Sequence, residues 1–191
     1  MLLNNEGIGE AGPVFEIAID LVRRNFETNV FAHLALSQHF IAKFIKEKRK
    51  GKIVFTSSMA GLFTPDGYGI YITTKHACEA IAEALCSELK KYNIQVQTIN
   101  PGAYLTGYNE TMADNPFRWL DDNENLTKRA EMRATFDSLL GTPQGRLDPR
   151  EIIEAMIKIV PAENGKFRNV VPRFVEDMLK EHQQKTWEVA I

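Results

Sequence analysis

The sequence predicts an α/β fold in which a parallel sheet is covered by helices on both faces. Three observations predict it. Short apolar runs without polar interruption, such as Ile53-Val54-Phe55, are typical of strands that are buried on both faces. Longer stretches between these runs repeat apolar side chains every three or four residues, as amphipathic helices do. The two kinds of segment alternate along the chain, and this order favours βαβ units.

The first part of the chain supplies two strands and one long helical pattern. Residues 1–4 give a short apolar strand, and several glycines with Pro13 then interrupt the chain. From residue 17 to about 48 the spacing is helical, and a break or cap within 25–29 would split this pattern into two helices. A basic end before Gly51 is a typical helix stop, and the strand at 53–55 follows.

The second part repeats the alternation around one long connection. A helical pattern from 71 to 92 precedes a strand at 94–99, while residues 103–147 look irregular and polar. A loop of this length is typical of a substrate loop or lid. Asp148-Pro149 predicts a helix start, and a strand at 167–171 and a charged tail complete the chain. We expect one domain over 1–191, with 103–147 as an insertion within it.

Composition narrows the class of protein. The chain has 191 residues, with 23 Lys and Arg against 25 Asp and Glu, and this balance argues against a nucleic-acid binder. No apolar run approaches the ~20 residues of a membrane helix, and the start does not resemble a signal peptide. Cys78 and Cys86 would lie ~12 Å apart on one helix, too far for a disulfide. From the unpaired cysteines and the lack of a signal peptide we expect a reduced, cytoplasmic protein. The histidines lack metal-ligand spacing, so we expect no metal.

Three side chains suggest proton chemistry. Tyr71 and Lys75 are four residues apart at a helix start, so they share a face. A free tyrosine is a poor acid or base at neutral pH, but a neighbouring ammonium favours the phenolate form. Ser58 follows a strand, where its hydroxyl can hydrogen-bond a substrate oxygen that gains charge. Taken alone, a Tyr-x-x-x-Lys pair also occurs on the surface of many proteins.

The order of several short motifs makes the pattern far more specific. The spacings are 24 residues from Asn5 to Asn29, 29 on to Ser58 and 13 on to Tyr71. With these spacings the chain resembles the short-chain dehydrogenase/reductase family, strongly over 1–106 and loosely over 148–172. The resemblance implies the C-terminal portion, about four strands, of a doubly wound Rossmann-like fold. The motifs that carry it are Asn4-Asn5-x-Gly7, Asn29, Ser58, Tyr71-x-x-x-Lys75 and Asn100-Pro101-Gly102.

The resemblance implies hydride transfer between NAD or NADP and a small-molecule carbonyl or alcohol. Tyr71 would be the general acid in reduction and the general base in oxidation. Lys75 would assist Tyr71 and hold the ribose next to the nicotinamide. Ser58 would orient the carbonyl, and Asn29 would hold a water that links Lys75 to solvent.

The resemblance also implies further cofactor contacts and an assembly. Asn5 would contact the adenosine side of the cofactor, and Pro101 and Gly102 would lie against it. The backbone around Tyr104 and the hydroxyl of Thr106 would meet the nicotinamide carboxamide. Family members often pair their two long helices, here roughly 25–48 and 71–92, which implies a homodimer or homotetramer.

Two departures from the family pattern leave alternatives open. Glu6 replaces an alanine beside the expected adenosine, where it would either repel a phosphate or point to solvent. The chain also begins at the family's fourth strand, without the Thr-Gly-x-x-x-Gly-x-Gly loop. A second hypothesis is therefore a non-catalytic fragment that acts only through assembly, with its first strand on an open sheet edge. The substrate and the choice between NAD and NADP stay open.

A glycine-rich segment imitates a nucleotide-binding motif. Gly7-Ile8-Gly9-Glu10-Ala11-Gly12 matches Gly-x-Gly-x-x-Gly literally. A dinucleotide fingerprint needs a buried strand before it, a helix after it and an acidic residue ~20 residues on. Here the preceding strand is thin, Pro13 follows, and the next strand lies ~40 residues on. We therefore interpret the segment as a flexible turn.

Overall fold

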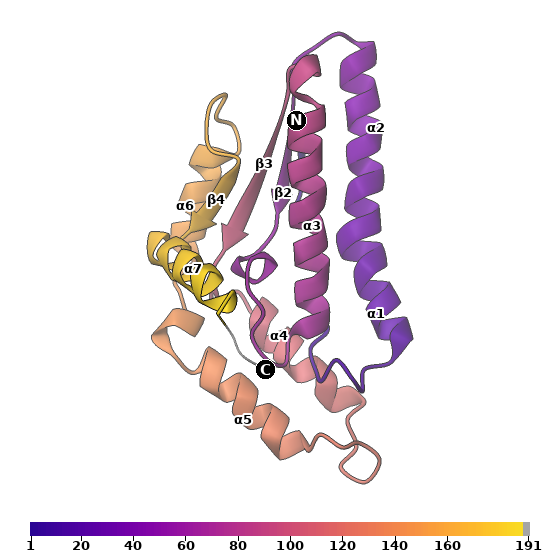
Figure 1. The fold of residues 1–191 in the computed structure, drawn as a ribbon, viewed down its shortest axis with the longest axis vertical. Helices are drawn as coiled ribbons and strands as arrows, with labels where there is room; N and C mark the ends of the chain where they lie inside the picture. Colours follow the sequence, from indigo (N-terminus) through magenta and orange to yellow (C-terminus); the bar gives the residue numbers. More distant parts are fainter. Residues whose placement is uncertain (189–191) are drawn as a thin grey trace.

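The computed structural model describes residues 1–188 and contains one sheet of four strands in the order β1-β2-β3-β4. Every neighbouring pair is parallel, so each strand is reached by a crossover connection (Figure 1). The predicted parallel α/β fold is thereby confirmed. The strands are β1 (Leu2–Asn4), β2 (Gly51–Thr56), β3 (Ile94–Pro101) and β4 (Arg168–Val171).

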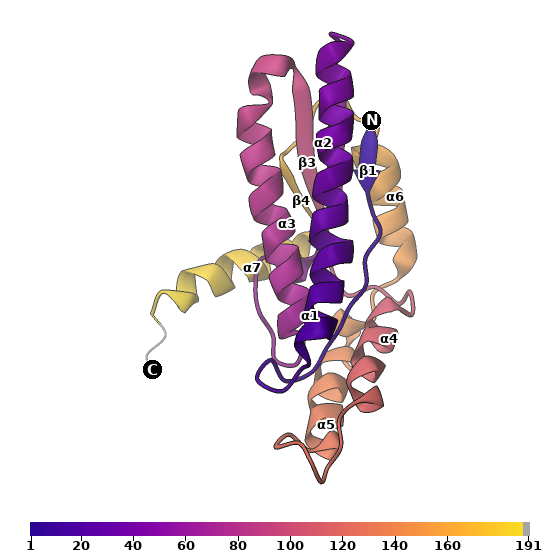
Figure 2. The same cartoon turned by 90° about the vertical axis from the view of Figure 1, so that its right-hand side faces the viewer.

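Helices cover both faces of this sheet (Figure 2). Side chains of β2 alternate between the two cores, as the pleat of a strand requires. Ile53 and Phe55 pack with Phe44 on one side, whereas Val54 packs with Ile152 on the other. The first face is covered by α2 (Ala32–Lys46) and α3 (Gly69–Glu88), the second by α6 (Pro149–Ile159).

Two α-helices do meet within the segment where the sequence suggested a division, but they are joined by a π-helical turn and not by a break or a cap. α1 (Ile19–Phe26) continues through a π-helical turn, Glu27–Phe31, directly into α2 (Figure 2). Asn25 and Asn29 are buried, and both use their side-chain amides to hold the 8–10 loop. Neither caps a helix end. The asparagines that suggested a cap therefore connect the helix to a distant loop. The π-helical turn that contains Asn29 is a feature often found at functional sites.

The expectation that 103–147 is irregular is also wrong. This segment contains α4 (Tyr108–Asp114), α5 (Arg129–Leu140) and short 3₁₀ turns at Asn115–Arg118 and Pro143–Gly145. Met132 and Phe136 lie one helical turn apart and are buried in the same core as Tyr68 and Ile72. Short helices in polar sequence take most of their stability from such packing, which explains the weak local pattern.

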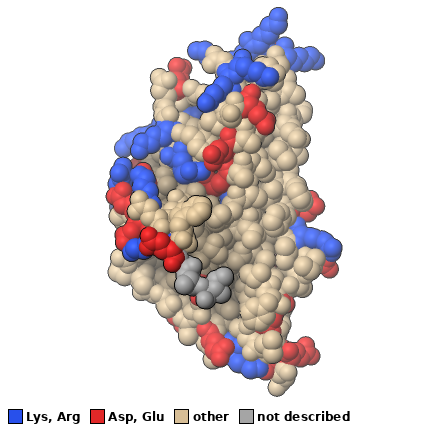
Figure 3. Space-filling view, viewed as in Figure 1, with Lys and Arg blue, Asp and Glu red and all other residues tan. Residues whose placement is uncertain are grey.

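The predicted charged tail is a helix as well, α7 (Arg173–Thr186). Only Val175 and Leu179 are buried along it, and exposed ion pairs at four-residue spacing follow. Within residues 1–188, no helix is long and apolar enough to cross a membrane. Figure 3 shows one face of the molecule, where charged side chains gather at the periphery around an uncharged centre.

Candidate active site

A cavity of about 440 Å³ lies where the parallel strands end, and we call it the polar cavity because Glu6 and Lys75 line it. Ligands of open parallel sheets bind at this edge, beyond the carboxyl ends of the strands. All predicted site residues except Asn29 line this cavity. They are Asn5, Ser58, Tyr71, Lys75, Pro101, Gly102, Tyr104 and Thr106.

Tyr71 and Lys75 occupy the first turns of α3, and both side chains are almost fully buried. The Lys75 ammonium donates a hydrogen bond to the backbone oxygen of Thr56 at 2.9 Å. It lies 5.7 Å from the centre of the Tyr71 ring. An ammonium has three N–H donors, so this bond to β2 fixes Lys75 while leaving donors for the cavity.

Ser58 is held in place by hydrogen bonds to its side-chain oxygen and to its backbone carbonyl oxygen. It caps the 3₁₀ turn Met59–Gly61, and its side-chain oxygen accepts a hydrogen bond from the backbone N–H of Ala60. Its carbonyl oxygen accepts a hydrogen bond of 3.0 Å from Asn100. Because the Ser58 hydroxyl acts as acceptor in the cap, its own proton stays free to be donated.

A buried polar network that the sequence analysis missed supports Ser58. The Glu79 carboxylate accepts hydrogen bonds from Asn100 Nδ2 at 2.6 Å and from Arg168 Nε at 2.9 Å. The Glu79 side chain is only 6% exposed, whereas that of Arg168 is 36% exposed. Glu79 follows Lys75 by four residues on α3, so its place on the same helix face was readable from the spacing.

Asn29 lies beneath the cavity and does not line it. Its amide donates to the Ile8 carbonyl and the Thr74 hydroxyl, and its oxygen accepts from the Ile8 N–H at 2.9 Å. A methyl group added at Gly7 would lie 3.5 Å from the Asn29 oxygen and 3.7 Å from Lys75 Nζ. Asn29 therefore fixes the turn that separates it from Lys75, and its water-binding role stays a prediction.

Tyr108 is a further site residue that the sequence analysis did not identify. Its ring lies 5.9 Å from that of Tyr71, and its buried hydroxyl has no hydrogen-bond partner among residues 1–188. Burial raises the pKa of Tyr108, and Tyr71 adds to the rise. Burial also raises the pKa of Tyr104, with a further contribution from Glu151, whose carboxylate accepts from its hydroxyl at 3.3 Å. Both phenols are therefore protonated at neutral pH.

Glu6 and His33 are titratable side chains that lie near Lys75. Glu6 lines the polar cavity with an exposed side chain, which favours the solvent-facing alternative for its carboxylate. His33 is buried below, where burial, and then the Lys75 ammonium, lower its pKa. The imidazole of His33 is therefore neutral at pH 7, and Lys75 is the principal cation of the cavity wall.

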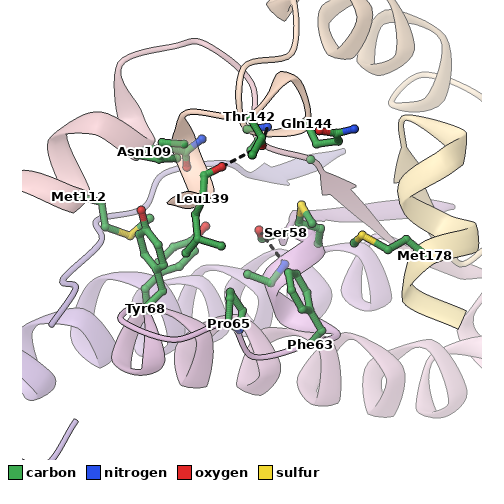
Figure 4. Close-up of a pocket in the computed structure, with 17 residues that line it drawn as sticks. Ser58, Phe63, Pro65, Tyr68, Asn109, Met112, Leu139, Thr142, Gln144 and Met178 are labelled. Carbon is green, nitrogen blue, oxygen red and sulfur yellow. Dashed lines mark hydrogen bonds between the residues drawn. The ribbon is translucent and has the colours of Figure 1, made fainter. Parts of the chain in front are cut away.

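A second cavity, of about 270 Å³, meets the first at Ser58, Tyr71, Gly102 and Asn109. Its walls come from the segment after β2, from the end of α5 and from α7 (Figure 4). Ser58 and Tyr71 therefore stand between a polar space and an apolar one. A ligand in each space would reach the same two hydroxyl groups.

The segment Gly7–Gly12 forms a loop, and the next helix begins only at Ile19. Its glycines serve close packing against the 108–119 segment. A methyl group at Gly9 would lie 2.2 Å from the Met112 sulfur, and Gly12 has a φ of +126° with Trp119 close by. These contacts account for the glycines without a phosphate.

A parallel sheet whose strand ends gather Ser58, Tyr71 and Lys75 in one cavity has the Rossmann-like architecture. A family model described as short chain dehydrogenase matches residues 1–116, more than half of the chain. The protein therefore belongs to the short-chain dehydrogenase family, as the motifs predicted.

Individual relatives agree with this assignment. The chain is 38% identical over 109 residues to an NADPH-dependent 3-dehydrocapnine reductase of Ornithobacterium rhinotracheale, covering 56% of this chain and 38% of the relative. It is 29% identical over 171 residues to a probable short-chain type dehydrogenase/reductase of Helicobacter pylori, covering 90% and 61%. The chain thus spans about two fifths and three fifths of the length of these two relatives.

Solved structures share the fold. A short-chain dehydrogenase/reductase from Burkholderia phymatum in complex with NAD matches with a TM-score of 0.75 at 21% identity, over 97% of this chain and 66% of that one. A short-chain dehydrogenase from Streptomyces avermitilis gives a TM-score of 0.74 at 22% identity, over 98% and 65%. At this level of identity the likeness concerns the fold alone.

Proposed function

We propose that this chain carries the active site of an NAD- or NADP-dependent oxidoreductase that interconverts a carbonyl compound and an alcohol. The observation that carries the proposal is the shared cavity of Ser58, Tyr71 and Lys75 at the strand ends. The names of similar proteins, one NADPH-dependent and one solved with NAD, support the cofactor class.

The donor groups of the polar cavity fit the nicotinamide half of such a cofactor. Lys75 keeps spare N–H donors beside its bond to Thr56, which suits the hydroxyls of a ribose. Thr106 and the backbone from Pro101 to Tyr104 line the same space and would hold the carboxamide. Asn5 would reach toward the adenosine. When bound, the reduced cofactor supplies a hydride to the carbonyl carbon, and the oxidised cofactor accepts it in the reverse direction.

The chain's own residues handle the proton. In reduction, the Tyr71 hydroxyl donates its proton to the substrate oxygen, while the Ser58 hydroxyl donates a hydrogen bond to the same oxygen. The Lys75 ammonium stabilises the phenolate that remains on Tyr71. In oxidation the proton moves in the opposite direction, from the alcohol to the phenolate. Burial raises the pKa of Tyr104 and of Tyr108, which makes both phenols weaker proton donors than a free tyrosine.

The decisive experiment follows NAD(P)H absorbance with a panel of ketones and compares the wild-type chain with Tyr71→Phe. We expect kcat to fall roughly 10²- to 10⁴-fold, because the general acid is removed while the ring is kept. Tyr92→Phe is the matched control, because Tyr92 is 43% exposed in the 3₁₀ turn Lys90–Tyr92 that follows α3. Unchanged turnover in Tyr71→Phe would contradict the mechanism. A folded wild-type chain that binds neither NADH nor NADPH would favour the non-catalytic hypothesis.

A further inference from the structure

Apolar side chains from three segments that lie far apart in the sequence contribute to the wall of the apolar cavity. Met59 and Phe63 come from the segment after β2, Leu139 and Leu140 from the end of α5, and Met178 from α7. Figure 4 shows Met178 extending from α7 on the opposite side of the cavity from Tyr68 and Met112. The catalytic pair proposed above, Ser58 and Tyr71, closes the remaining end.

No charged side chain lines this cavity within residues 1–188. An ionised group that enters an apolar space without a partner loses its hydration, which strongly disfavours its binding there. The polar cavity on the other side of Tyr71 differs, because Lys75 and Glu6 line it. A ligand in the apolar cavity therefore gains from burying carbon and loses from burying charge.

The polar atoms of the apolar cavity are few, and some are already paired. The Thr142 hydroxyl donates to the Leu139 carbonyl at 3.1 Å and accepts from the Gly145 N–H at 3.1 Å. Tyr68 is 7% exposed, and its hydroxyl has no partner among the described residues. Asn109 already donates to the Tyr104 carbonyl at 3.5 Å, so the Tyr68 hydroxyl, the Gln144 amide, the Asn109 side-chain oxygen and the catalytic hydroxyls are left for a ligand.

The mouth of the cavity lies beside α7. Met178 is 40% exposed there. Helix α7 is held against the segment after β2 by two contacts, since Gln183 donates to the Leu62 carbonyl at 3.3 Å and the His182 ring lies 5.7 Å from that of Phe63. The wall that selects the ligand is therefore partly built by a helix outside the catalytic motifs.

From these observations we infer that the substrate is an uncharged, largely apolar ketone or secondary alcohol whose body fills the apolar cavity while its oxygen meets Ser58 and Tyr71. This inference rests on the proposed function. A volume of about 270 Å³ is near the lower end of the range for small-molecule sites, and this sets a rough limit on ligand size. A medium-length aliphatic chain or a single aromatic ring meets this limit.

The test compares 2-octanone with 7-oxooctanoate, which has the same chain with a terminal carboxylate. Binding to the wild-type chain is measured by ligand-observed NMR, with and without NADPH. We expect 2-octanone to bind at least about tenfold more tightly, because the carboxylate meets no cation in the apolar cavity. Equal or tighter binding of 7-oxooctanoate would overturn the inference, as would no detectable binding of 2-octanone at its solubility limit.

Two variants of Met178 test whether this residue of α7 determines the preference for the uncharged ligand. Met178→Lys places a cation at the mouth, so it is expected to weaken 2-octanone binding and strengthen 7-oxooctanoate binding, each by about fivefold or more. Met178→Leu keeps the side chain apolar and is expected to leave both affinities within about twofold. Identical behaviour of the two variants would overturn the assignment of this wall.

Tyr71→Phe separates this inference from the proposed function. The variant is expected to lose its turnover but to keep its 2-octanone affinity within about tenfold, because the ring still closes the cavity and Ser58 still donates to the ketone oxygen. Selective binding of 2-octanone without turnover in the wild-type chain would contradict the proposed function alone. Turnover that favours 7-oxooctanoate would overturn the substrate class alone.

Discussion

The two cavities that meet at Tyr71 differ in both chemistry and origin. The polar cavity is built from strand ends and the first turns of α3, where backbone geometry brings the side chains together. The apolar cavity depends on α5 and α7. Their lining residues Leu139 and Met178 follow Tyr71 by more than 60 residues in the chain. A common edge of the sheet thus provides the reaction chemistry, while peripheral helices provide the ligand-sized space.

Lys75→Met gives the largest effect that we expect from a change confined to one cavity. The Lys75 ammonium lines the polar cavity and is absent from the apolar one. Its loss should weaken NADPH binding roughly 10- to 100-fold, because charged hydrogen bonds contribute ~1.5–3 kcal/mol. Fluorescence titration measures this change, and 2-octanone binding should stay as in the wild type. Lys91→Met, at an exposed position, is the control. Parallel loss of both ligands would show that the cavities are not independent.

Glu79→Ala tests the hydrogen-bond network that holds Ser58, a residue that lines both cavities. Glu79 is buried with Asn100 and Arg168, so removing its carboxylate leaves two donors unpaired. We expect the free energy of unfolding in urea to fall by about 2–3 kcal/mol, less than for a fully buried pair because Arg168 is partly exposed.

Glu83→Ala is the matched control for this change. Glu83 is 72% exposed and 3.5 Å from Arg168, so its loss should cost less than ~0.5 kcal/mol. Equal losses in the two variants would show that the Glu79 network is not buried support for Ser58.

Tyr68→Phe gives the smallest effect and sharpens the description of the apolar cavity. Its hydroxyl is buried without a described partner, a situation that costs stability. We therefore expect the variant to be neutral or more stable by up to about 1 kcal/mol in urea unfolding without ligand. Tyr104→Phe loses a hydroxyl that pairs with Glu151 and should be less stable by ~0.5–1.5 kcal/mol. The opposite order would show that the Tyr68 hydroxyl has a partner in the free protein.

Much of the polar cavity could be predicted from the sequence because its residues belong to short motifs. Tyr71 and Lys75 share a helix face whatever the tertiary structure, and strand ends of a parallel sheet meet at one edge. Asn29 was assigned to the site, but the structure shows it beneath the cavity, holding Ile8. Tyr108 was missed, although it follows Thr106 by only two residues in the segment expected to touch the cofactor.

The apolar cavity was not predictable in the same way. Its wall includes α5 and α7, which were expected to be an irregular loop and a charged tail. Their buried positions are few, with Met132 and Phe136 in one helix and Val175 and Leu179 in the other. A pair of apolar residues one turn apart is too weak a signal in otherwise polar sequence, because such helices depend on tertiary packing.

The sequence by itself determined the order of the four strands, the long helical patterns before β2 and β3, the shared face of Tyr71 and Lys75, and the family. The first three follow from local backbone periodicity, and the family follows from short motifs in a fixed order, which each segment carries in its own residues. Only the tertiary structure decided that Leu139 and Met178 face Ser58 across one cavity, and that Glu79 reaches Asn100. Contacts between such distant segments depend on how whole elements pack, and no local pattern encodes that packing.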